Sequence, residues 1–301
     1  MADATALQLV EEIAKGLQVS RNVNYAYLAS YMIVYFDWLL VSESEIRLVW
    51  NAEGVKMKVL YSLTRYLPII YFPLLVPYHF QNGYTDSECA TLYKVISASF
   101  MIATHSAALV VTIRTWAVWG KAKYMTYILF GTYAVVFALI LVFYIISLKY
   151  TSHPEVFRGF PFGCVPKYTS RYLPAALMVE AVYDTVITAL MLIRGISLYQ
   201  WGKNSRLFQT LYRDGIVFYV CITVVSIANV VLSSSRPLQG NYYVLLLTMQ
   251  GGVRSVLACR IILHIRMQYD ALQTNILPRP VIKSDRTTVL IERSAIELRD
   301  G

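Results

Sequence analysis

The residues of this chain that could do chemistry are charged side chains inside long apolar stretches. Asp37, Arg65 and Arg254 each interrupt such a stretch. Charges are costly inside a membrane, so they usually pair with one another and often mark a functional site. At about 1.5 Å per helical residue, the three lie at a similar depth, roughly 20 Å from the outer ends of their stretches. We therefore predict one buried cluster with Asp37 between the two arginines. It would act as a switch or ion-linked core, or else as a structural clamp in which Arg65 reaches Glu45.

A second group of polar residues could bind a ligand. Glu180 and Asp184 are four residues apart, and this spacing places both carboxylates on one face of a helix. Two carboxylates there could recognise a cationic ligand or relay protons. Lys94 and His105 are their candidate partners, and Asn229 lies in a neighbouring apolar stretch. The alternative is ordinary hydrogen bonding between helices, without a ligand.

Signatures of catalysis and of cofactor binding do not occur in the sequence. We find no Gly-rich phosphate loop and no dinucleotide-binding, metalloprotease or serine-hydrolase motif. The histidines and cysteines show no spacing typical of a metal site, and no CxxC pair occurs. The basic residues are divided among several loops, which argues against nucleic-acid binding. We predict a protein that is not an enzyme and that holds no metal or cofactor.

The composition indicates a protein of the lipid bilayer. Hydrophobic residues make up 57% of the 301 residues and charged residues 15%, against about 25% charged in soluble domains. A membrane helix needs roughly 20 apolar residues, and we identify seven such stretches. Their approximate bounds are 24–50, 59–80, 89–119, 124–149, 172–199, 215–234 and 242–265. The predicted fold is an all-α bundle of seven transmembrane helices. Residues 1–23 would be an extracellular segment, 24–266 the membrane domain and 267–301 a mostly disordered cytosolic tail.

Two local features should bend or loosen these helices. Pro68, Pro73 and Pro77 should kink the second stretch. Gly251 and Gly252 could loosen the last stretch just before its arginine. Both features could serve a ligand cavity.

The basic residues determine the predicted orientation. Lys and Arg number 27 against 18 Asp and Glu, a net charge of +9. More of them lie in the short connections on the side opposite the N-terminus, which is typical of the cytosolic side. We predict an outer N-terminus, a cytosolic C-terminus and a place in the plasma membrane rather than an internal one. The polar segment before the first stretch lacks a cleavage site, so that stretch would be an uncleaved anchor.

Two cysteines would lie on the predicted outer side. Cys89 opens the third stretch, and Cys164 lies in the longest outer loop. Disulfides persist in oxidising compartments, so we predict a bond that clips this loop to the third stretch. The alternative is two free thiols. Cys221 and Cys259 lie inside apolar stretches and are expected to be packing residues.

Several short motifs resemble a known family. They are Phe36-Asp37-Trp38-Leu39-Leu40, Glu45-Ile46-Arg47-Leu48-Val49-Trp50, Arg65-Tyr66-Leu67-Pro68, and the ends of the third and seventh stretches, Ile113–Trp119 and Cys259–Arg266. Together they resemble the fungal multi-pass membrane proteins of the domain of unknown function 6533 family, with Phe36 where Tyr is usual. The specific motifs cover roughly residues 24–70. This resemblance implies a multi-pass membrane protein and brings no established activity.

More distantly, the chain resembles seven-span G-protein-coupled receptors. The seven stretches, the outer N-terminus and the cysteine pair are similar. Arg114 stands at the cytosolic end of the third stretch, where such receptors place an arginine. The chain departs from them at Ile113, where they carry an acidic residue, and it lacks their Asn-Pro-x-x-Tyr motif. The resemblance implies that Arg114 could contact a cytosolic signalling partner.

These observations lead to one functional prediction with two alternatives. A receptor-like sensor would admit a small extracellular ligand among the third, fifth, sixth and seventh stretches, close to the second group of polar residues. Binding would shift the buried charges and change the cytosolic loops. The first alternative is a secondary transporter or ion-coupled carrier that uses the same intramembrane charges. The second is a non-signalling scaffold that assembles with membrane partners.

Overall fold

The computed structural model describes residues 2–52, 54–81, 83–152, 164, 167–168, 172–201, 206–234 and 242–276. The chain divides into two compact units, Met1–Leu263 and His264–Gly301. The first unit contains every residue of the candidate site. Residues 277–301 of the predicted tail (267–301) lie outside the described residues.

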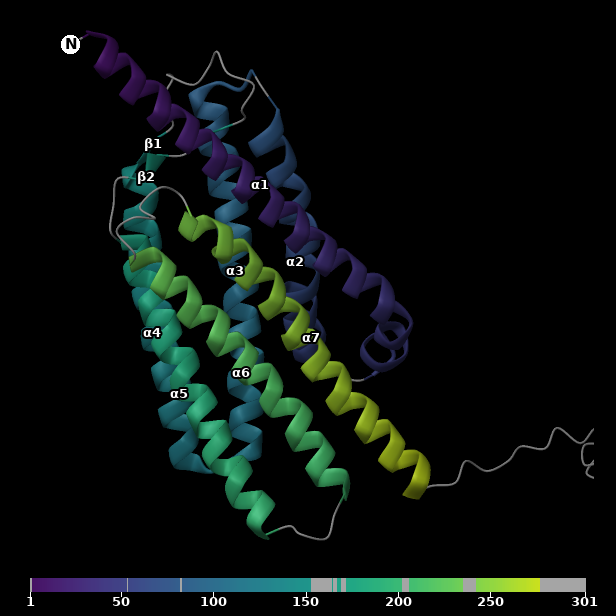
Figure 1. Ribbon diagram of the computed structural model, residues 1–301. Coiled ribbons are helices and arrows are strands. Elements are labelled where there is room, and N and C mark those ends of the chain that lie inside the picture. The colour runs from purple at the N-terminus through teal and green to yellow at the C-terminus, as the bar shows by residue number, and fades with distance from the viewer. Residues whose placement is uncertain are drawn as a thin grey trace, which may run out of the picture. The chain divides into compact units, whose positions relative to one another are not determined.

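Helices account for almost all of the described chain. They are α1 (Ala2–Glu45), which continues into a π-helical turn η1 (Ile46–Trp50), α2 (Val55–Phe80), α3 (Asp86–Val118), α4 (Lys123–Tyr150), α5 (Tyr172–Trp201), α6 (Arg206–Ser234) and α7 (Tyr242–Ile276) (Figure 1). A two-residue antiparallel ladder pairs β1 (Thr151–Ser152) with β2 (Lys167–Tyr168). The all-helical prediction is confirmed, and each predicted stretch falls on one helix.

Three helices are clearly longer than the stretches predicted for them. α6 begins at Arg206, nine residues before its predicted stretch, and α1 and α7 extend farther. α1 begins at Ala2, so the segment expected to precede the membrane domain is helical. α7 continues to Ile276, so the first ten residues of the predicted disordered tail are helical instead. Polar residues with good helix propensity extend α1 and α7 beyond their apolar parts, where a hydropathy pattern gives no signal.

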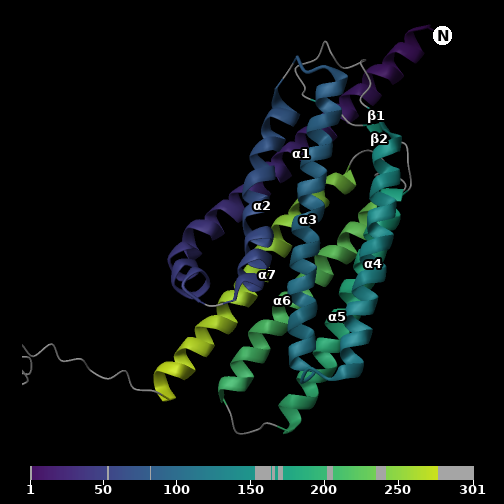
Figure 2. The ribbon, with the colours of Figure 1, turned by 180° about the vertical axis from the view of Figure 1, so that it is seen from behind.

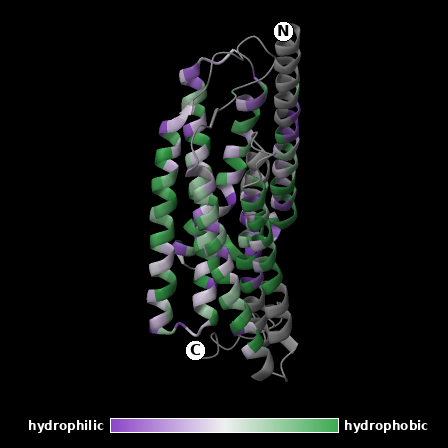
Figure 3. Ribbon diagram, turned by 60° about the vertical axis from the view of Figure 1, so that its left-hand side comes forward, coloured by the Kyte–Doolittle hydropathy of each residue, from purple (hydrophilic) through white to green (hydrophobic). Residues whose placement is uncertain are grey.

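Four helical segments are long and apolar enough to cross a bilayer. They are Val55–Phe80, Asp86–Val118, Lys123–Tyr150 and Pro174–Ser197, and a shorter apolar segment lies in α6 at Ile216–Leu232. Hydrophobic residues run along these helices (Figure 3). Many large apolar side chains of α4 are exposed, such as Tyr127, Val135 and Val142. Lipid tails can cover such a face, so the prediction of a membrane protein is confirmed; the count of seven spans stays a prediction.

Buried side chains form two apolar clusters between the helices. One lies around Tyr61, Leu129, Ile187 and Ile261 and joins α2, α4, α5 and α7. The other contains aromatic residues of α1 and α2 together with both disulfide cysteines. α2 packs along α3, and α5 packs along both α4 and α6, as Figures 1 and 2 show from opposite sides. This packing holds the polar side chains of α5, α6 and α7 inside the unit.

The paired glycines of α7 permit close packing and do not interrupt the helix. A Cβ on Gly251 would collide with the Phe100 ring of α3, and a Cβ on Gly252 would lie 3.2 Å from Val34 of α1. α7 is continuous through both positions. α2 is likewise continuous through its three prolines. The glycines therefore place α7 close to α1 and α3, a role that the sequence prediction of a loosened helix did not include.

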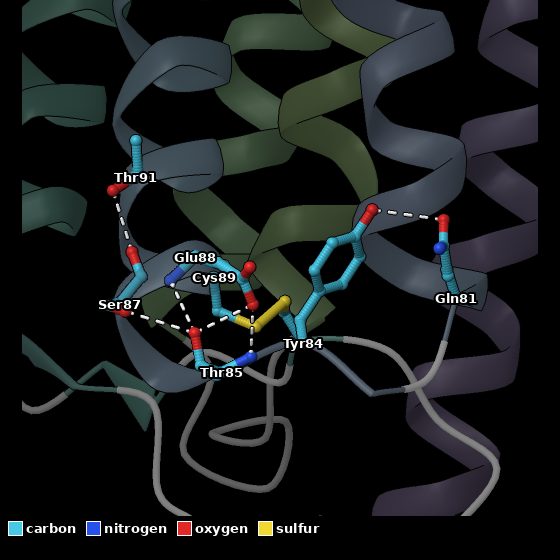
Figure 4. The surroundings of a disulfide bond; sticks show 8 residues. Gln81, Tyr84, Thr85, Ser87, Glu88, Cys89 and Thr91 are labelled. Carbon is cyan, nitrogen blue, oxygen red and sulfur yellow. Dashed lines mark hydrogen bonds between the residues drawn. A yellow bond between two sulfur atoms is a disulfide. The ribbon is translucent and has the colours of Figure 1, made fainter.

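A disulfide joins Cys89 to Cys164, as the sequence predicts. Their Cα atoms are 5.7 Å apart, and the Cys164 amide donates to the Tyr78 carbonyl of α2 at 2.7 Å. Figure 4 shows the start of α3 beside this bond, where Thr85 and Glu88 form a capping box. The Thr85 amide donates to Glu88 Oε2 at 2.7 Å. Cap and disulfide together fix one end of α3.

Candidate functional site

Asp37 lies between two arginines inside the helical unit. Arg65 Nη1 donates to Asp37 Oδ2, and Arg65 Nη2 donates to the Asp37 carbonyl at 3.1 Å. Arg260 Nε of α7 donates to Asp37 Oδ1 at 2.6 Å. Asp37 and Arg65 are buried, whereas 46% of the Arg260 side chain is exposed. The predicted arrangement of one aspartate and two arginines is present, but the second arginine is Arg260 and not Arg254.

Glu45 holds the other side of Arg65. Tyr66 Oη donates to Glu45 Oε1, and Trp50 Nε1 donates to the same oxygen at 3.1 Å. Arg65 Nε lies 3.8 Å from Glu45 Oε2. The π-helical turn η1 directly follows Glu45 and ends at Trp50, so the wider turn brings this indole back to the carboxylate. Short π-helical segments are rare and often occur at functional sites.

These six residues, Asp37, Glu45, Trp50, Arg65, Tyr66 and Arg260, are called the Asp37 network below. It contains two carboxylates and two guanidinium groups, so its charges balance. Balanced, hydrogen-bonded charges are the form in which ionised side chains are tolerated in an apolar interior. Arg65 reaches both Asp37 and Glu45, so the two pairings that the sequence left as alternatives occur together.

Arg254 belongs to a different cluster, on α5, α6 and α7. Its Nη1 donates to Glu180 Oε1 at 2.6 Å, and its Nη2 donates to Asp184 Oδ2. Ser226 Oγ also donates to Asp184 Oδ2, at 2.6 Å. The side chains of Arg254, Asp184 and Ser226 are buried, and 15% of the Glu180 side chain is exposed. One guanidinium group therefore serves two carboxylates that lie one turn apart on α5.

Two amide side chains extend this cluster. Gln250 Nε2 donates to Ser226 Oγ at 3.0 Å, and Asn229 Nδ2 donates to Gln250 Oε1. We call Glu180, Asp184, Ser226, Asn229, Gln250 and Arg254 the Arg254 network. Sequence reasoning missed Ser226 and Gln250. Helical spacing is the sequence signal that could have identified them. Ser226 and Asn229 are three residues apart, and Gln250 and Arg254 are four apart, so each pair shares one helix face.

A small cavity adjoins the Arg254 network between α3, α5, α6 and α7. Asp184 and Arg254 contribute to its lining, which also includes Ala108, Val111, Tyr183, Ile187, Thr188, Tyr219 and Ile222. Its volume of about 10 Å³ is close to the space that one water molecule needs. These are the four helices among which the sequence predicts a ligand. In this conformation the cavity has room for a water molecule and not for a larger ligand.

Three sequence-predicted residues are not members of either network. Lys94 is exposed on α3 and forms no ion pair in the part of the chain that the structure describes. His105 is buried, and its ring lies 4.9 Å from that of Phe137 in α4. Arg114 is buried near the end of α3. Arg254, rather than Lys94 or His105, is the partner of the two α5 carboxylates.

The structure offers no evident metal site within its described ranges. Among those residues, no group of three or more His, Cys, Asp and Glu side chains could hold a metal ion. All four carboxylates of these ion pairs, Asp37, Glu45, Glu180 and Asp184, face an arginine. This arrangement is suited to hydrogen bonding and proton exchange.

Comparison with known proteins adds one finding. Residues 25–70 match the model of a family of unknown function, DUF6533. No curated protein matches the chain. The matched segment covers part of α1, all of η1 and part of α2. It contains every member of the Asp37 network except Arg260. The match supports the resemblance of this segment to the family.

Proposed function

We propose that the chain is a seven-span, receptor-like sensor of a small extracellular ligand. The observation that carries the proposal is the position of two arginines on α7. Arg254 pairs with α5, and Arg260 pairs with Asp37 of α1. A change at one network can therefore reach the other through a single helix.

The proposed response begins at the cavity beside Arg254. A ligand that opens the cavity and contacts Asp184 or Arg254 would change the ion pairs that hold α7 against α5. Arg260 is six residues farther along α7, about 9 Å at 1.5 Å per residue. Movement of α7 would then alter the contact of Arg260 with Asp37 and the turn η1 nearby. Buried packing and ion pairs favour two discrete arrangements over gradual deformation.

The proposed orientation places the disulfide end outside and the η1 end in the cytosol. An oxidising compartment maintains a disulfide, and Cys89 lies at the start of α3. The opposite ends of the helices carry basic residues that attract anionic lipid, namely Arg47, Lys56, Lys58, Lys121 and Lys123. In this orientation Arg114 faces the cytosolic half, where a signalling partner would bind, and the plasma membrane is the proposed location.

An ion-coupled carrier is the second candidate function. The Arg254 network favours it because two carboxylates share one arginine, an excess of one negative charge whenever both carboxylates are ionised. Carriers use such charges to bind protons or ions. The two functions differ in one measurable property, because a carrier moves its ligand or ion across the membrane and a sensor does not.

Reconstitution into liposomes tests the two functions together. A library of small cationic and polar compounds is screened for changes in hydrogen exchange at residues 46–52, and proton and solute flux are measured in parallel. We expect at least one compound to change hydrogen exchange at residues 46–52 without causing net flux of protons or solute. In Arg260→Gln the exchange response should be lost, whereas Arg47→Gln, which alters an exposed arginine of η1, should retain it. Flux that Asp37→Asn abolishes would reject the sensor and support the carrier.

A further inference from the structure

We propose that the Arg254 network binds one proton, shared between Glu180 and Asp184, when the protein is folded at neutral pH. This inference goes beyond the sensing role, because it concerns the resting charge of the network and not the response of the helices. It rests on the ion pairs, the burial and the neighbours of the two carboxylates.

The charges of the Arg254 network do not balance. Glu180 and Asp184 both pair with Arg254. No other Lys or Arg in the described part of the chain lies within ion-pair distance of either carboxylate. Arg254 is 2% exposed and Asp184 8%. An unbalanced charge at such a depth is costly, and a group in this position binds a proton in preference to remaining ionised.

The neighbouring helices supply hydrogen bonds but little positive charge. α6 contributes Ser226, and α5 itself contributes Tyr183, whose Oη lies 2.6 Å from Thr112 Oγ1 of α3. α4 contributes Tyr133, whose ring contacts Tyr183. None of these side chains is a cation at neutral pH. The charge of the network therefore depends on its own two carboxylates and Arg254.

His105 of α3 is a further titratable group near Arg254, within its electrostatic range. Its ring packs against Phe137, and its Nε2 has no hydrogen-bond partner. A second cation next to Arg254 would be repelled by the guanidinium group. The proton is accordingly assigned to the carboxylate pair, and a His105 variant can test that assignment.

The cavity adjoins one of the two carboxylates and the arginine. Both Asp184 and Arg254 line it, and Arg254 Nε has no hydrogen-bond partner although the side chain is buried. Tyr183, Thr188 and Tyr219 also line the cavity, so a single water there has residues with polar groups around it. Such a water can carry a proton to or from Asp184. Two coupled carboxylates bind and release that proton as a pair.

The Asp37 network provides an internal contrast. Its two carboxylates face two guanidinium groups, Arg65 and Arg260. Its charges balance with both carboxylates ionised, so the same reasoning assigns it no proton. The proposal is thus specific to one of the two networks.

Infrared spectroscopy of the whole chain in lipid bilayers tests the proposal. A protonated carboxyl group gives a carbonyl stretching band that shifts in D₂O. We expect this band in the native protein at neutral pH, at an intensity of one group per chain. Glu180→Gln removes one negative charge and should abolish the band, because Asp184 and Arg254 then balance. Glu43→Gln, at an exposed position of α1, and His105→Gln should both retain it.

Thermal unfolding against pH gives a second readout that does not depend on assigning a band. A folded state that holds one more proton than the unfolded state loses stability as pH rises, by about tenfold in the folded-to-unfolded ratio per pH unit. This slope should appear near neutral pH in the native protein and be absent in Glu180→Gln. A native protein without the band, a band that persists in Glu180→Gln, or a slope lost only in His105→Gln would each overturn the proposal.

Discussion

Arg65 is the residue on which both carboxylates of the Asp37 network depend. It donates two hydrogen bonds to Asp37 and lies 3.8 Å from Glu45. Arg260 contacts the same aspartate from α7, but almost half of its side chain is exposed. Removal of one partner from a buried ion pair leaves an unpaired buried charge, whereas an exposed pair contributes little. The two arginines therefore differ in their expected effects on stability, although they share one carboxylate.

We expect Arg65→Gln to lower the free energy of unfolding by about 3–5 kcal/mol. For Arg260→Gln the expected loss is below about 1 kcal/mol, because water or lipid headgroups can replace its exposed contact. Thermal unfolding in the same detergent gives both values. If the two variants lost equal stability, the difference in burial would not control the strength of these pairs.

The sequence identified the charged residues but assigned one of them to the wrong cluster. Asp37 and Arg65 were correctly placed together, because their helices are adjacent in the chain and packed side by side. Arg254 was assigned to the same cluster from its estimated depth, yet it pairs with Glu180 and Asp184. Depth along a helix does not tell which neighbour a side chain faces. The neighbour is determined by packing between segments that lie far apart in the sequence.

At the scale of elements, α7 is the helix that joins the parts of the candidate site. It contributes one arginine to each network, and Ser255 Oγ donates to the Thr64 carbonyl of α2 at 2.6 Å. Gly251 and Gly252 bring it close to Phe100 and Val34. The number of helices followed from hydropathy, whereas the extra length of α1, α6 and α7 did not. The close approach of α7 could not be predicted either, since a glycine pair is compatible with either a flexible or a tightly packed helix.

Gly251→Ala should destabilise the protein by about 1–3 kcal/mol, because the new methyl group displaces the Phe100 ring. Gly131→Ala in α4 is the matched control. No atom of another segment in the described structure lies within 4 Å of the Cβ position there, and alanine favours a helix over glycine by up to about 1 kcal/mol. Unfolding in detergent compares the two. Equal effects would show that α7 does not pack closely at Gly251.

At the scale of the molecule, the two charge networks differ in balance and are connected by one helix. The Asp37 network is neutral and lies largely within the segment that matches DUF6533. The Arg254 network has two carboxylates for one guanidinium group and adjoins a cavity. In the proposed sensor, the Arg254 network responds to the ligand and the Asp37 network passes the change on to the turn η1. Composition predicted the membrane, but only the tertiary arrangement separates the two networks.

Hydrogen exchange at residues 46–52 most directly tests whether α7 couples the networks. The comparison uses the native chain, Glu180→Gln, Arg260→Gln, the double variant that combines these two changes, and Glu43→Gln as the control. Glu180→Gln changes only the Arg254 network, so coupling through α7 predicts a change in exchange at these distant residues of about fivefold or more. The double variant should show no change beyond that of Arg260→Gln alone, and the control should match the native chain. Unaltered exchange in Glu180→Gln, or an equal response in the double variant, would contradict coupling through α7.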